Sequence, residues 1–134
     1  MSPVTSNEVN NAISDLKNNG KGANTISAIA IKNNKHTISA ILSHIFNNCI
    51  SDGYFPSELK EGCITPIYKG GLKTELNNYR PVCSLLPFSK IFERILYDRM
   101  INYIDKHNIL SEKQFGFRKG LSTENAIINF IDNI

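Results

Sequence analysis

The residues best suited to chemistry lie in one segment, residues 64–86, where three basic side chains flank two consecutive glycines. The basic residues are Lys69, Lys73 and Arg80, and the glycines are Gly70 and Gly71. Arginine presents a planar fork of donors that fits two phosphate oxygens, whereas lysine is a mobile point charge. Glycine lets the backbone approach a ligand closely because it has no side chain. The pattern suits phosphate binding, although a solvated surface loop with ordinary charges has the same composition and is the commoner case.

The cysteines and histidines are scattered along the chain, which argues against a metal site and against a disulfide framework. Zinc ligands usually come in pairs only a few residues apart, and no pair of cysteines or of histidines has that spacing. An odd number of cysteines favours a reducing compartment. We therefore expect no metal and no cofactor in this chain. Packing or surface roles are predicted for all six residues: Cys49, Cys63, Cys83, His36, His44 and His107.

Positive charge is concentrated in the second half of the chain. The net charge is +3, from 15 Lys and Arg against 12 Asp and Glu. Residues 60–120 hold eleven basic and six acidic side chains, a balance of +5, which leaves −2 for the rest. An anionic partner should therefore meet the second half.

Composition predicts one soluble domain over residues 1–134. Hydrophobic residues make up 41% and charged residues 20% of the chain, which is ordinary for a globular protein. No apolar run is long enough to span a bilayer, and the N-terminus has neither a basic region nor an apolar region of the signal-peptide type. We expect an intracellular protein that is not secreted and does not meet a membrane.

Five segments have helical signals. Thr5 and Glu8 form a capping-box pattern that predicts the start of the first helix, and residues 18–20 predict its end. Residues 21–34 predict a loop and a short helix. Residues 37–52 carry apolar side chains on one continuous face and end at Gly53. Residues 87–107 form a long helix, and a last helix opens at Ser122 with an apolar face that still runs at Ile134. The C-terminus is therefore interpreted as a truncation.

Between the helices the pattern changes to that of two strands. Residues 63–68 are rich in β-branched and aromatic side chains, and Pro66 favours an edge position. A short turn at residues 56–59 precedes this strand, and a second strand is predicted at residues 82–85 after a long basic loop. The sequence thus predicts an α+β fold, mostly helical with a small antiparallel β-hairpin.

Several motifs in the same order and spacing resemble the reverse transcriptases of non-LTR retrotransposons, of the LINE-like and jockey-like kind. The resemblance covers almost the whole chain, and earlier segments at residues 3–17, 45–47 and 53–60 fit it too. The motifs are ITPIYK (64–69), NNYRP (77–81), SLL (84–86), FSKIFER (88–94) and QFGFR (114–118), followed by Ser122 and Thr123.

The resemblance implies the fingers subdomain of a right-hand polymerase, truncated before the palm. It implies that Lys69 and Arg80 lie near the triphosphate of an incoming deoxynucleoside triphosphate. Lys73, Arg118 and Lys119 become candidate contacts to the template or its backbone, and the partners implied for a full-length protein are an RNA template and a DNA primer. Three segments depart from the family pattern: Gly70 to Leu72 lack a second Lys and an Asp, Val82 and Cys83 replace Ile and Ser, and residues 20–25 lack a Pro-Gly-x-Asp sequence.

The catalytic carboxylates of the family are missing from these residues. Polymerases hold two divalent ions with aspartates, and the resemblance implies that those aspartates lie beyond Ile134. Asp132 follows a helical pattern and is interpreted as an exposed helix position. Mg²⁺ is therefore expected only in a full-length polymerase, and no catalytic residue and no primer extension are expected from this chain alone.

Two other interpretations stay open at this point. The chain could be a non-catalytic module whose basic half binds nucleic acid or a protein partner. It could also be an inert remnant, because a cut domain exposes the apolar faces of its terminal helices.

Overall fold

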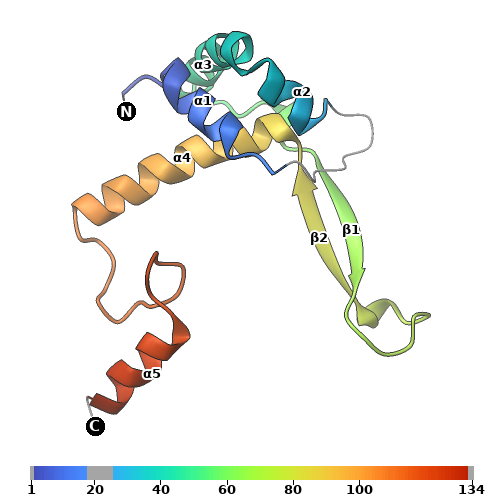
Figure 1. Ribbon diagram of the computed structural model, residues 1–134, viewed down its shortest axis with the longest axis vertical. Helices are drawn as coiled ribbons and strands as arrows, with labels where there is room; N and C mark the ends of the chain where they lie inside the picture. Colours follow the sequence, from blue (N-terminus) through green and yellow to red (C-terminus); the bar gives the residue numbers. More distant parts are fainter. Residues whose placement is uncertain (1, 18–25, 133–134) are drawn as a thin grey trace. The chain divides into compact units, whose positions relative to one another are not determined.

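The computed structural model describes residues 2–17 and 26–132 (Figure 1). The chain divides into two compact units, Met1–Tyr97 and Asp98–Ile134, and each is described by itself. The described residues confirm an α+β fold with one antiparallel hairpin. No helix among them is long and apolar enough to cross a membrane.

The first helix, α1, spans Ser6–Ser14 and begins with the predicted capping box. The Thr5 hydroxyl accepts a hydrogen bond from the Glu8 backbone N–H at 3.2 Å, and the Glu8 carboxylate accepts one from the Thr5 N–H at 2.8 Å. Two further bonds join the segment before α1 to a later helix: Asn47 accepts from the Val4 N–H and donates to the Val4 carbonyl. Helix α1 ends at Ser14 with Asp15 as its C-cap, earlier than the stop predicted from residues 18–20. Residues 18–25, which include the departure at residues 20–25, lie outside the described residues.

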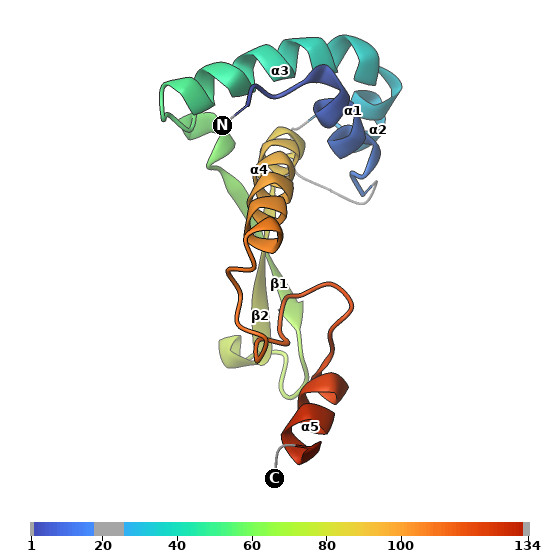
Figure 2. The ribbon, with the colours of Figure 1, turned by 90° about the vertical axis from the view of Figure 1, so that its left-hand side faces the viewer.

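Two helices follow, the short helix α2 (Ala28–Asn33) and the long helix α3 (Lys35–Ser51), and both pack against α1 (Figure 2). Gly53 ends α3 as predicted, in the left-handed region at φ 61°. There the Tyr54 N–H donates to the Cys49 carbonyl at 3.0 Å and the Gly53 N–H to the Ile50 carbonyl at 3.4 Å, the bond pair of a Schellman motif.

The predicted apolar face of α3 is only partly buried. Leu42, Phe46 and Cys49 are in the core, whereas Ile41 is 58% exposed and Ile45 is 41% exposed. The apolar face of α3 is wider than the area that α1 and α4 cover, so one edge of this face is exposed to solvent.

The core of the first unit is centred on the start of helix α4 (Pro87–Lys106). The Phe92 ring is 2% exposed and stacks on Phe46 at 4.5 Å and on Phe55 at 5.4 Å between ring centroids. Ser89, also buried, donates a 2.7 Å hydrogen bond to the Leu59 carbonyl. This bond connects α4 to the 3₁₀ turn Ser57–Leu59, which starts one residue later than the predicted turn, with Pro56 before it.

The hairpin consists of β1 (Gly62–Tyr68) and β2 (Tyr79–Leu85), joined by a loop that includes a 3₁₀ turn at Leu76–Asn78. The second strand begins at Tyr79, three residues before the predicted start at Val82. Pro66 and Pro81 lie directly opposite each other in the register. Since neither proline can donate to the ladder, their pairing at a position without inter-strand bonds costs the sheet nothing.

The second unit contains the end of α4 and helix α5 (Thr123–Asp132). The predicted start of α5 is confirmed, because the Ser122 hydroxyl accepts from the Asn125 N–H at 3.3 Å and the Asn125 side chain accepts from the Ser122 N–H at 2.9 Å. The large apolar side chains of α5 are exposed, and so is Tyr103 near the end of α4. The predicted continuation of the apolar face of α5 to Ile134 lies outside the described residues.

Candidate functional site

The register of the hairpin brings Lys69 and Arg80 to the same face. Arg80 pairs with Ile67, and Lys69 lies two residues beyond Ile67, where its N–H donates to the Asn78 carbonyl at 2.9 Å. Side chains two residues apart along a strand, and those directly opposite on the partner, share one face. Lys69 and Arg80 are therefore diagonal neighbours, within the reach of two long side chains.

Both cationic groups on this face are available to a ligand. Arg80 is exposed, as is Lys69, and neither side chain makes a hydrogen bond or an ion pair with the described residues. Arg80 could instead have a structural role, in which its guanidinium bonds to backbone carbonyls beside Pro81. No such bond is present among the described residues. Ile67 and Val82 share the face and are also exposed, so a ligand would meet two cations beside two apolar side chains.

The loop between the strands is held by three side chains that bond to its backbone carbonyls. Asn78 donates to the Leu72 carbonyl at 2.9 Å, and the Tyr79 hydroxyl donates to the Lys73 carbonyl at 2.9 Å. The Tyr68 hydroxyl donates to the Gly71 carbonyl. The sequence predicts a role only for the arginine of the NNYRP motif, whereas the structure shows that Asn78 and Tyr79 of the same motif hold the loop.

Gly71 has a structural reason to be glycine. Its φ of 96° is in the left-handed half of conformational space, and a Cβ placed there would lie 2.6 Å from the Asn78 side-chain nitrogen. The backbone of the loop thus approaches a side chain of the protein at this position. Close approach to a ligand, which the glycine pair suggested, stays a prediction.

Lys73 does not join Lys69 and Arg80. Its ammonium lies 5.9 Å from the centroid of the Tyr68 ring, in the range of a cation–π contact. Tyr68 is adjacent in sequence to Lys69 and Ile67, so its side chain is on the opposite face of the hairpin. The three basic residues that the sequence placed together are therefore divided between two faces.

Arg118 and Lys119 lie in the second unit, in the loop between α4 and α5. One Arg118 nitrogen donates to the Ser111 carbonyl at 3.3 Å, which fixes the guanidinium to its own loop. Phe117, next to it, has a φ of 61° and a fully exposed ring. Lys119 is exposed.

The three cysteines are free and do not form a site. Cys63 and Cys83 are exposed and lie on opposite faces of the hairpin, since they pair with Ser84 and Ile64 respectively. Burial raises the pKa of the Cys49 thiol. Among the described residues no three His, Cys, Asp or Glu side chains come together to hold a metal ion, so this part of the chain offers no fit for the two ions of a polymerase.

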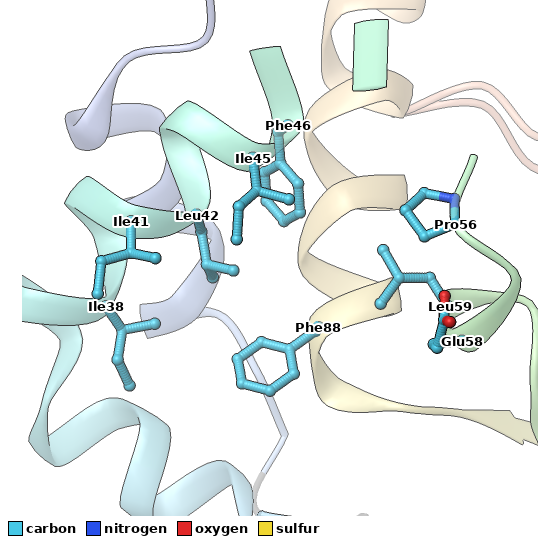
Figure 3. A pocket seen from close by; sticks show the side chains of 9 residues that line it. All are labelled: Ile38, Ile41, Leu42, Ile45, Phe46, Pro56, Glu58, Leu59 and Phe88. Carbon is cyan, nitrogen blue, oxygen red and sulfur yellow. The ribbon is translucent and has the colours of Figure 1, made fainter. Parts of the chain in front are cut away.

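The larger cavity of the first unit, of about 420 Å³, is apolar (Figure 3). Figure 3 shows side chains of α3 on one side and Phe88, Leu59 and Pro56 on the other. Glu58 carries the only charged group among the lining residues. Ile41 and Ile45, at the exposed edge of α3, are part of the cavity lining. These two side chains carry no polar group that could take part in catalysis.

No protein-family model matches the chain. The similar proteins that a comparison finds are proteins of transposable elements. The chain is 31% identical over 97% of its length to the RNA-directed DNA polymerase from mobile element jockey of Drosophila melanogaster. It is 35% identical over 67% of its length to a probable RNA-directed DNA polymerase from transposon X-element of the same species. It is 33% identical over 89% of its length to a putative 115 kDa protein of the type-1 retrotransposable element R1DM. The matched segments make up 15%, 10% and 12% of these relatives, so the chain spans only a small part of their length.

Proposed function

Because this chain is homologous to a segment of the reverse transcriptases of non-LTR retrotransposons, we propose that it contributes contacts to the incoming nucleotide and the RNA template in such an enzyme. Lys69 and Arg80 bind the triphosphate of the nucleotide. Lys73, Arg118 and Lys119 contact the template or its backbone. The chemical step, with its two divalent ions, depends on carboxylates that the described residues do not provide.

The observation that carries this proposal is the shared face of Lys69 and Arg80. A triphosphate presents several anionic oxygens within a short distance, and two cations from adjacent strands can engage them together. Arg80 provides a bidentate fork, and Lys69 provides a charge that can follow the phosphate as it moves. The loop beside them is held by Asn78, Tyr68 and Tyr79, so the face is formed before a ligand arrives.

Substitution of Arg80 tests the bidentate contact. In a polymerase that contains this segment together with the catalytic aspartates, Arg80→Lys should raise the KM for nucleotide about three- to tenfold, because lysine keeps the charge and loses the fork. Lys69→Ala should act in the same direction, with little dependence on the base. Both effects should weaken as the salt concentration rises.

Lys73→Ala is the matched control, because it removes the same charge from the same loop on the opposite face. It should leave the KM for nucleotide unchanged. The assignment of Arg80 is wrong if Arg80→Lys lowers the thermal midpoint while the nucleotide kinetics of the folded protein stay the same. That outcome would make Arg80 a structural residue of the hairpin.

A further inference from the structure

A second cavity of the first unit, of about 370 Å³, lies where the base of the hairpin meets the helices. Its lining comes from three parts of the chain: the end of α1 and the residues after it, the base of β2, and the first turns of α4. The side chains that carry the argument are Ala12, Leu16, Lys17, Ser84, Lys90 and Arg94. None of them is among the residues that the sequence motifs assigned to a ligand.

The cavity combines an apolar wall with a cationic rim. Ala12 is buried and Leu16 half-buried, and they form the apolar part. Lys17, Lys90 and Arg94 bring three positive charges, against one carboxylate from Asp15. An apolar wall beside cations fits an anion whose neighbouring group offers a C–H face, such as the phosphate and ribose of a nucleic-acid backbone.

Lys90 and Arg94 are placed so that one anion can meet both. They lie four residues apart on α4, so their side chains project from neighbouring turns of the same helix face. The half-buried Lys90 ammonium donates to the Ser84 hydroxyl at 3.2 Å, which orients it and leaves further N–H donors for a ligand.

Ser84 connects this cavity to the face of the hairpin that bears Lys69 and Arg80. It lies four residues after Arg80 on β2, and side chains an even number of residues apart share a face. Four residues of strand correspond to about 14 Å. A nucleic-acid strand that lies beside a nucleotide held by Arg80 therefore reaches the cavity after a short distance.

We propose that this cavity binds a backbone phosphate of the RNA strand, a contact that continues the basic face of the hairpin and rests on the function proposed above. Lys90 and Arg94 hold the phosphate oxygens, Lys17 adds charge at the rim, and the ribose lies against Ala12 and Leu16. The contact reads no base, so it positions RNA of any sequence.

Fluorescence anisotropy of the 134-residue chain with a labelled single-stranded oligouridylate of about 12 nucleotides tests this contact. Lys90→Gln and Arg94→Gln should each weaken binding about two- to fivefold, whatever the RNA sequence. Loss of one phosphate contact should reduce the slope of log Kobs against log salt by about 0.7 for a single strand. Between about 50 and 200 mM salt, the affinity of each variant should therefore fall about 2.6-fold less than that of the unaltered chain.

Two further variants keep the result interpretable. Lys17→Gln removes an exposed charge from the rim and cannot disturb the core, so it should weaken binding even where Lys90→Gln impairs folding. Lys32→Gln on α2 removes one positive charge outside the cavity and should leave the salt slope unchanged. Equal slopes for the Lys17, Lys90 and Arg94 variants and the unaltered chain would overturn the proposal.

Competition separates an RNA contact from a site for a small anion. Unlabelled RNA should displace the labelled strand, whereas inorganic phosphate or free nucleotide at the same phosphate concentration should not. Displacement by inorganic phosphate that depends on Lys90 would make the cavity a small-anion site and overturn the proposal.

Lys73→Gln, measured in the same assay, separates this inference from the template contact in the proposed function. If Lys73→Gln weakens RNA binding and the cavity variants do not, the inference fails and the proposed template contact stands. If only the cavity variants weaken it, the cavity is supported as an RNA contact while the assignment of Lys73 to the template fails.

Discussion

Truncation of Phe92 to alanine should remove the centre of the core of the first unit. The Phe92 ring is 2% exposed and is stacked on two other rings, Phe46 at 4.5 Å and Phe55 at 5.4 Å between centroids. Replacement of a buried phenylalanine by alanine costs about 3–5 kcal/mol, from lost transfer free energy and the cavity that remains. Each aromatic pair adds about 0.5–1.5 kcal/mol beyond its buried area, so we expect the upper part of that range.

Urea and thermal unfolding, followed by circular dichroism, measure this cost. One kcal/mol shifts the midpoint of a domain of 60–100 residues by about 4–8 °C, so Phe92→Ala should lower it by at least about 12 °C. The variant could fail to fold, because a small domain has only about 5–15 kcal/mol of stability. If Phe92→Ala does not fold, Phe92→Leu can be measured instead. Leucine keeps most of the side-chain volume and loses both ring pairs, so it should lower the free energy of unfolding by about 1–2 kcal/mol.

Phe130→Ala on α5 is the matched control. The Phe130 side chain is 68% exposed, so its loss should change the free energy of unfolding by less than about 0.5 kcal/mol. Equal midpoints for the unaltered chain and both Phe92 variants would place Phe92 on the surface. That result would refute the packing of α3 against α4 on which the position of the hairpin base depends.

Three local features give further expectations. Thr5→Ala removes half of the capping box and should cost about 1 kcal/mol of stability, measured by urea unfolding. Gly71→Ala forces a Cβ to 2.6 Å from the Asn78 side chain at a positive φ, so it should cost about 1–3 kcal/mol and weaken nucleotide binding by displacing the loop. Because burial raises the pKa of the Cys49 thiol, less thiolate is present at mildly alkaline pH, and a thiol reagent should modify the other two cysteines first in the folded chain. Modification of all three cysteines at one rate would show that Cys49 is accessible.

Features set by neighbouring residues were predicted well. The Thr5–Glu8 capping box, the end of α3 at Gly53 and the start of α5 at Ser122 were all confirmed. Each of these helix ends is formed by a side chain, or by a residue with left-handed backbone, that bonds within one turn of the helix. The bonding groups are therefore close in sequence.

Predictions that depended on packing partners were less accurate. Residues 37–52 were predicted to carry one continuous apolar face, and on that face Ile41 and Ile45 are exposed. The spacing of apolar residues determines which side chains share a face of the helix. The width of the surface packed against that face determines how many of them are buried. The early start of β2 has a similar cause. Arg80 and Pro81 are weak strand signals by themselves, and the partners that β1 supplies pair them into the hairpin.

The sequence by itself determined which residues could bind phosphate and to which family of proteins they are related. It could not decide which of Lys69, Lys73 and Arg80 act together, because side chains in a hairpin alternate between two faces and a slip of one residue exchanges the faces. The observed register, with Ile67 opposite Arg80, places Lys69 beside Arg80, and the contact with Tyr68 places Lys73 on the other face. Only the tertiary structure brought Lys17, Ser84, Lys90 and Arg94 to one cavity, since three elements that are distant in sequence must fold together to form it.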